Sequence, residues 1–126
     1  MKKTFSIGNF CEHIITPALE KVGWIRYDQI SYYEDADFEY KHLNTEYVLY
    51  FKPNIPIAVI SVTENNTNID TGLKTAINNA ELLDIPCAFS SNGKGFAFYN
   101  RTKSSNCTIT NISIDKFPTP DELWQI

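Results

Sequence analysis

Long apolar runs are missing from this sequence of 126 residues. A membrane-spanning helix needs about 18 or more consecutive apolar residues, and no segment comes near that length. The basic start, residues 1–5, has no apolar stretch behind it of the kind that a secretory signal requires. We therefore expect a protein without membrane segments and with a cytoplasmic location.

Cysteine is scarce, and its three positions lie far apart in the sequence: Cys11, Cys87 and Cys107. No Cys-x-x-Cys pair occurs, and an odd number of cysteines is a poor basis for a disulfide framework. Because Cys11 and Cys87 sit in apolar runs, we predict that they are buried free thiols.

An excess of positive charge is also lacking, because 15 acidic side chains outnumber 11 basic ones and the formal net charge is -4. A protein that binds DNA irrespective of its sequence needs a basic face. The composition therefore excludes a strong electrostatic hold of that kind, and it leaves a weak or assisted contact open.

What the sequence does contain is the composition and periodicity of a single globular α/β domain over residues 1–126. Apolar side chains recur at steps of three and four in residues 7–22 and 70–83, which predicts two helices. Segments rich in β-branched and aromatic residues predict strands at 25–33, 46–51, 57–62, 87–90, 96–99 and, weakly, 108–114. A short turn makes the second and third strands antiparallel, and the intervening helix makes the third and fourth parallel. The predicted order is helix-strand-strand-strand-helix-strand-strand, with a mixed central sheet and flanking helices.

Several polar residues mark where helices begin. Pro17 interrupts the first helical pattern, so we predict a kink there or a fresh segment with Thr16 as its cap. Asp70 or Thr71 is predicted to cap the second helix. Residues 119–122, Thr-Pro-Asp-Glu, have the sequence of a capping box, which predicts a short last helix.

Four stretches of the sequence resemble one known family. They read IITPALEKVGW (14–24), EYVLYFKPNIPIAVISVTENN (46–66), AINNAELLDIPCAFSSNGKGFAFYNRT (76–102) and FPTPDELW (117–124). These phrases are similar to the N-terminal endonuclease domain of type I restriction enzyme R (restriction) subunits. The resemblance implies a restriction-endonuclease-like fold of the PD-(D/E)xK superfamily, with Mg²⁺ as cofactor and DNA as substrate. It also implies the other subunits of a type I restriction-modification complex as partners.

The family's catalytic positions are occupied unusually in this chain. In the family, an Asp and a Glu on neighbouring strands hold the metal, and a Lys two residues after the Glu stabilises charge on the phosphate. These positions correspond here to Glu46, Ser61 and Thr63. Residues two apart on a strand face the same side, so 61 and 63 should share one pocket. A Gln-x-x-x-Tyr pair that the family uses on the next helix to place DNA falls on Thr75 and Asn79.

The resemblance therefore implies a degenerate catalytic motif, with Glu46 as the one remaining metal ligand. A single electrostatic group at a transition state contributes about 3–4 kcal/mol, so neutral Ser61 and Thr63 predict little or no cleavage. For the pocket itself we favour an ordinary structural role, in which the segment is only core sheet and the two hydroxyls satisfy a neighbouring strand or loop. One functional alternative is an active Mg²⁺-dependent DNA endonuclease that uses Glu46 and a displaced carboxylate such as Glu64 or Glu34. Another is a stand-alone interaction or regulatory protein on the same fold.

The ATP-binding sequence Gly-x-x-x-x-Gly-Lys-Ser/Thr does not occur in this chain. The motor domain of a full R subunit is therefore not expected here. The chain is either a fragment of a longer subunit or a small separate protein.

Overall fold

The computed structural model describes residues 11–40, 42–43, 45–63, 69–101 and 109–125. In chain order the elements are the π-helical segment η1 (Cys11–Ile15), α2 (Thr16–Lys21), β1 (Ile30–Tyr32), β2 (Tyr47–Lys52), β3 (Ile55–Val62), α3 (Ile69–Leu83), β4 (Cys87–Ser91), β5 (Gly95–Asn100), β6 (Thr110–Ser113) and α4 (Pro120–Trp124). Among the described residues, none of the helices combines the length and the apolar character that a bilayer span demands.

The strands of the described residues form one six-stranded sheet in the order β1-β2-β3-β4-β5-β6. β3 and β4 are parallel, with Ala58 opposite Cys87 and Val62 opposite Ser91. The other neighbouring pairs are antiparallel. The predicted mixed α/β class and the order of elements are confirmed, including the parallel pair on either side of α3.

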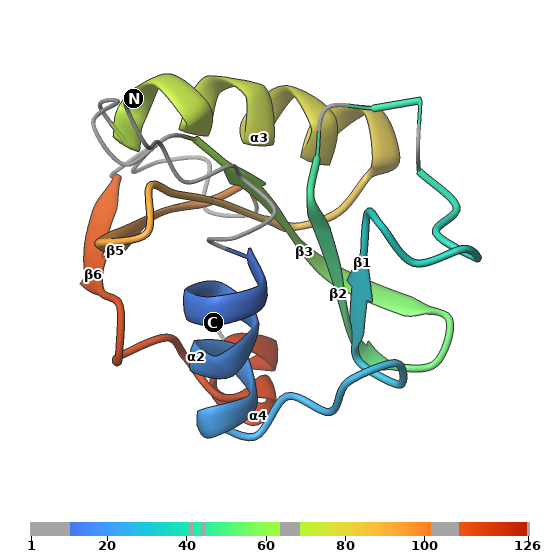
Figure 1. Cartoon of the computed structure of the whole chain (residues 1–126). Coiled ribbons are helices and arrows are strands. Elements are labelled where there is room, and N and C mark those ends of the chain that lie inside the picture. The colour runs from blue at the N-terminus through green and yellow to red at the C-terminus, as the bar shows by residue number, and fades with distance from the viewer. Residues whose placement is uncertain (1–10, 41, 44, 64–68, 102–108, 126) are drawn as a thin grey trace, which may run out of the picture.

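Helices cover both faces of the sheet, with α3 on one face and α2 and α4 on the other (Figure 1). Side-chain alternation along the strands divides the core accordingly. On β3, Ile60 and Val62 belong to the core on the α2 side, whereas Val59 packs with Leu73 and Ala76 of α3. The odd-numbered positions at the end of β3 therefore face α3, which decides where the polar residues there point.

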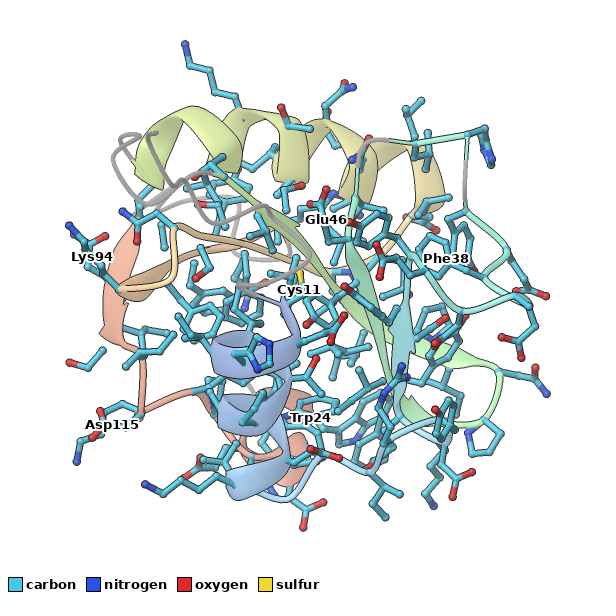
Figure 2. All side chains as sticks on the ribbon, in the orientation of Figure 1. Cys11, Trp24, Phe38, Glu46, Lys94 and Asp115 are labelled. Carbon is cyan, nitrogen blue, oxygen red and sulfur yellow. The ribbon has the colours of Figure 1, made fainter. Side chains whose placement is uncertain are left out.

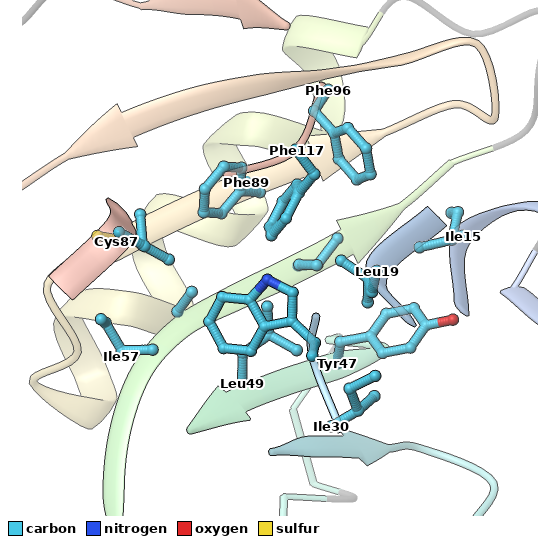
Figure 3. Packing of buried hydrophobic residues seen from close by; sticks show 14 of the residues in the cluster. Ile15, Leu19, Ile30, Tyr47, Leu49, Ile57, Cys87, Phe89, Phe96 and Phe117 are labelled. Atoms are coloured by element: carbon cyan, nitrogen blue, oxygen red, sulfur yellow. The ribbon is translucent and has the colours of Figure 1, made fainter. Parts of the chain in front are cut away.

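Aromatic residues fill the core on the α2 side (Figure 3). The Phe117 ring lies 4.6 Å from the Phe89 ring and 4.7 Å from the Phe96 ring, measured between centroids. Trp24 Nε1 donates to the carbonyl oxygen of Pro118 at 2.9 Å. These contacts attach the segment before α4 to both the sheet and the end of the N-terminal helices.

The first predicted strand is shorter in the structure than its sequence indicates. β1 comprises Ile30–Tyr32, and the backbone before it turns at Tyr27, which has a φ of 75°. Arg26 holds this turn by donating to both carboxylate oxygens of Asp35, at 2.9 and 2.7 Å. The ion pair therefore joins the turn before β1 to the turn that follows it.

Two predicted helix caps are wrong. The N-cap of α2 is Ile15, and the Thr16 hydroxyl instead hydrogen-bonds the hydroxyl of Tyr47. α3 begins at Ile69, before both Asp70 and Thr71. The fresh segment predicted at Pro17 is present, since that residue lies in the first turn of α2.

The C-terminal capping box is confirmed. Thr119 Oγ1 accepts from the backbone N–H of Glu122 at 3.1 Å, and the Glu122 carboxylate accepts from the N–H of Thr119 at 2.9 Å. This reciprocal pair starts α4 with Pro120 in its first turn.

Candidate functional site

A pocket of about 220 Å³ lies where β3 ends beneath the beginning of α3. Its described lining consists of Glu46, Ser61, Val62, Thr63, Gly72 and Thr75. The fold thus brings together Glu46, the two hydroxyl residues at the end of β3 and Thr75, all of which the sequence singles out. Asn79, the remaining predicted site residue, is not among the lining residues.

β-sheet pairing places Glu46 beside the end of β3. Tyr47 is the register partner of Ile60, and the backbone N–H of Glu46 donates to the carbonyl oxygen of Ile60 at 3.1 Å. Thr45 Oγ1 donates to the same oxygen, also at 3.1 Å. Glu46 lies on the α3 side of the sheet and Cys11 on the opposite side (Figure 2).

The carboxylate of Glu46 makes a short hydrogen bond to the backbone. Its Oε1 accepts from the N–H of Val62 at 2.7 Å, so the side chain joins the start of β2 to the end of β3. Burial raises the pKa of the Glu46 carboxyl above its ordinary value, and the N–H donors of Val62 and Glu46 oppose the shift without cancelling it. Glu46 therefore holds its proton more tightly than an exposed glutamate does.

The two hydroxyl residues on β3 take part in the sheet. Ser61 is buried and lies opposite Ser90. The backbone N–H of Thr63 donates to the carbonyl oxygen of Ser91 at 2.8 Å, and Thr63 Oγ1 approaches the same oxygen at 3.4 Å. Thr63 thus extends the pairing of β3 with β4 by one residue beyond the strand.

Gly72 allows α3 to approach the sheet closely at the pocket. A Cβ atom at this position would lie 2.7 Å from Thr63 Cγ2 and 3.3 Å from Ser90 Cβ. Sequence reasoning did not identify this residue. A single glycine inside an otherwise helical pattern is the available signal, because it often marks close packing.

Comparison with known proteins finds a homologous subunit. No protein-family model matches the chain. Over 83 residues, 65% of its length, the chain is 43% identical to the type I restriction enzyme EcoAI endonuclease subunit of Escherichia coli. The chain is a homologue of type I restriction endonuclease subunits. The resemblance predicted from the quoted phrases is thereby confirmed.

A solved structure gives independent support for the fold. It is a fragment assigned to an HsdR subunit of a type I restriction enzyme from Vibrio vulnificus YJ016, and it matches with a TM-score of 0.76 at 21% identity. The match covers 98% of this chain and 25% of that one. The sequence match covers only 10% of the Escherichia coli subunit, so this homologue corresponds to a small part of such a protein.

The described residues around the pocket of this type I subunit homologue do not by themselves fit a tight Mg²⁺ site. Mg²⁺ requires near-octahedral oxygen ligands and is usually held by one or two carboxylates. Glu46 is the one carboxylate among the described lining residues, and one of its oxygens already accepts from Val62. Across the described ranges there is no group of three or more His, Cys, Asp or Glu residues that could hold a metal.

The two carboxylates considered as substitutes do not add to the described site. Glu34 does not line the pocket, and its Oε1 accepts from the Tyr32 hydroxyl at 3.4 Å. Glu64 lies outside the described residues. Asn79, one helical turn after Thr75, is buried with 4% of its surface exposed, so a direct contact of its side chain with DNA would need α3 to move.

Proposed function

We propose that the chain is a nuclease-fold module of a type I restriction system that contacts DNA or its partner subunits without cutting DNA. The observation that carries this proposal is the pocket itself. The three positions that the resemblance identifies with the family's catalytic residues line one pocket, and they supply one engaged carboxylate and two neutral hydroxyls.

The expected loss of activity follows from the groups that are absent. Each well-placed electrostatic group at a transition state is worth about 10²–10³ in rate. Replacing an acid and an amine with Ser61 and Thr63 should therefore lower the rate by about 10⁴-fold or more, although such contributions do not add strictly.

Any contact with DNA should be weak or assisted. The net charge of -4 opposes attraction to phosphates, so binding would depend on basic groups brought by the partner subunits of the complex. We expect duplex DNA binding to be measurable only at low salt for the isolated chain.

A plasmid-nicking assay with Mg²⁺ or Mn²⁺ tests the proposal directly. The wild-type chain should nick no faster than Glu46→Ala, and the double variant Ser61→Glu with Thr63→Lys should gain activity because both side chains face the pocket. Adding Glu46→Ala to the double variant is the matched control and should remove that gain. Cleavage by the wild-type chain that disappears in Glu46→Ala would contradict the proposal.

The two alternatives give different results. An active enzyme that uses Glu46 with Glu34 or Glu64 would cleave DNA, and the rate would fall in Glu34→Gln or Glu64→Gln. A stand-alone interaction protein would neither bind nor cut duplex DNA, and it would co-purify with a methyltransferase or motor subunit.

A further inference from the structure

We propose that the Glu46 pocket binds a protonated primary amine, the group that a lysine side chain or a polyamine carries. This inference rests on the proposed function, because it requires that no tightly held metal occupies the pocket. In this proposal the pocket binds a cationic ligand and does not catalyse a reaction.

The charge of the pocket favours a cation. Glu46 is the one ionisable residue among its described lining residues. The two ion pairs found among the described residues join Arg26 to Asp35 and Arg101 to Asp84, so neither involves Glu46. A cation placed here would meet the charge of a half-buried carboxylate, where an ion pair is screened less than at a fully exposed position.

The oxygen atoms of the pocket suit an ammonium group better than a divalent metal. An ammonium presents three hydrogens and needs three acceptors. Besides the carboxylate of Glu46, the lining includes the hydroxyl residues Ser61, Thr63 and Thr75. A hydroxyl oxygen has two lone pairs and still accepts while it donates elsewhere, as Thr63 Oγ1 does to Ser91. Mg²⁺ would have to lose water for one carboxylate and several neutral oxygens, which it does reluctantly.

The pocket has the size and lining for the end of an alkylammonium chain. Its volume of about 220 Å³ corresponds to roughly seven waters at about 30 Å³ each, which is enough for an ammonium and its first methylenes. Thr63 Cγ2 points toward Gly72 and gives the pocket an apolar edge. A lysine ammonium is a compact charge on a flexible stem, so its head can reach Glu46 while its methylenes contact this edge.

NMR titration of the ¹⁵N-labelled chain tests the inference, with the Val62 amide as the main reporter because it donates to Glu46. We would add n-butylammonium chloride as a lysine side-chain mimic, with n-butanol and NaCl as neutral and ionic-strength controls. We expect saturable shifts at Val62, Thr63 and Thr75 at millimolar butylammonium, and none from either control. Glu46→Gln should weaken binding at least tenfold, whereas Glu81→Gln, an exposed acid on the far part of α3, should leave it unchanged.

Spermidine separates the two sources of the ammonium group. Affinity at least tenfold above that of butylammonium identifies a polyamine, and similar affinity identifies a single ammonium such as a lysine side chain. Shifts that do not saturate, or that persist in Glu46→Gln, overturn the inference. A parallel titration with MgCl₂ keeps the two proposals distinct. A saturable shift of the Val62 amide with Mg²⁺ counts against the proposed function. If only butylammonium fails to bind, this inference alone is overturned.

Discussion

The contact between Gly72 and Thr63 gives the sharpest test of how the pocket is built. In Gly72→Ala, the new Cβ would lie 2.7 Å from Thr63 Cγ2, whereas ordinary contact begins at 3.4 Å. One of the two groups must therefore move by 0.7 Å, which is 3.4 minus 2.7. Overpacking of this kind costs about 1–3 kcal/mol, and the better helix propensity of alanine returns about 1 kcal/mol. We expect Gly72→Ala to lower the free energy of unfolding by about 1 kcal/mol.

Removing the obstructing methyl group should reverse this effect. Thr63→Ser deletes Cγ2 and keeps the hydroxyl near Ser91. In that background the remaining close neighbour is Ser90 Cβ at 3.3 Å, which needs only a small adjustment. Gly72→Ala should then be neutral or stabilising by up to about 1 kcal/mol, so the double-mutant cycle should show a coupling of about 1–2 kcal/mol.

Urea unfolding of the four proteins measures this coupling. Asn78→Ala, at an exposed position of α3, is the matched control, because it changes helix propensity without facing Thr63. Its effect should be the same in both backgrounds. If Gly72→Ala destabilises the wild-type chain and the Thr63→Ser variant equally, the close approach of α3 to β3 is not the reason why residue 72 must be glycine.

Three further predictions concern the capping box of α4, the aromatic core and the half-buried carboxyl of Glu46. Thr119→Ala should lower the free energy of unfolding by about 1 kcal/mol, because it removes the acceptor for the N–H of Glu122, and Thr119→Ser should not; urea unfolding distinguishes them. Phe89→Ala should cost about 3–5 kcal/mol in the same assay, since this ring is fully buried; a cost below about 1 kcal/mol would contradict the described core. Glu46→Gln should raise the Tm at pH 8 and change it little at pH 4 in thermal unfolding followed by circular dichroism. The sign follows because the pKa of Glu46 is higher in the folded chain than in the unfolded chain. The protonated carboxyl stabilises the folded chain fully at pH values below the unfolded-state pKa, and this stabilisation is lost as the pH rises through the folded-state pKa. A Tm difference of equal size at both pH values would refute a destabilising negative charge on Glu46.

The parts of the fold that could be predicted are those that local patterns determine. Strand pairing follows from the short turn before β3 and from the helix between β3 and β4, and both features are visible as sequence spacing. Thr119 and Glu122 predict α4 because a capping box involves only neighbouring residues. The turn before β1 instead involves the ion pair of Arg26 with Asp35, and the Thr16 hydroxyl hydrogen-bonds that of Tyr47. Such tertiary partners cannot be read from a local pattern.

The candidate site likewise has features that the sequence predicts and features that only the structure reveals. The positions of Glu46, Ser61 and Thr63 were available from the resemblance together with the two-residue period of a strand. The role of Gly72 was not, because it becomes evident only when α3 is placed against β3. The raised pKa of Glu46 was equally inaccessible, since it depends on how much solvent the neighbouring elements remove. That the selected positions serve binding or catalysis stays a prediction for the nicking and titration assays to decide.

The structure also indicates why recovering a charged triplet in this pocket should be costly. Thr63 pairs with Ser91 through its backbone, and its methyl group packs toward Gly72, while Ser61 is buried beside the same helix. Both residues therefore take part in the packing between α3 and the sheet, and both also line the pocket. Introducing Glu at 61 would place a second carboxylate close to Glu46 in a site where burial already raises one pKa. Stability and cleavage should consequently change in opposite directions in the Ser61→Glu, Thr63→Lys variant, because the larger side chains that favour phosphate chemistry disturb the present packing of Ser61 and Thr63.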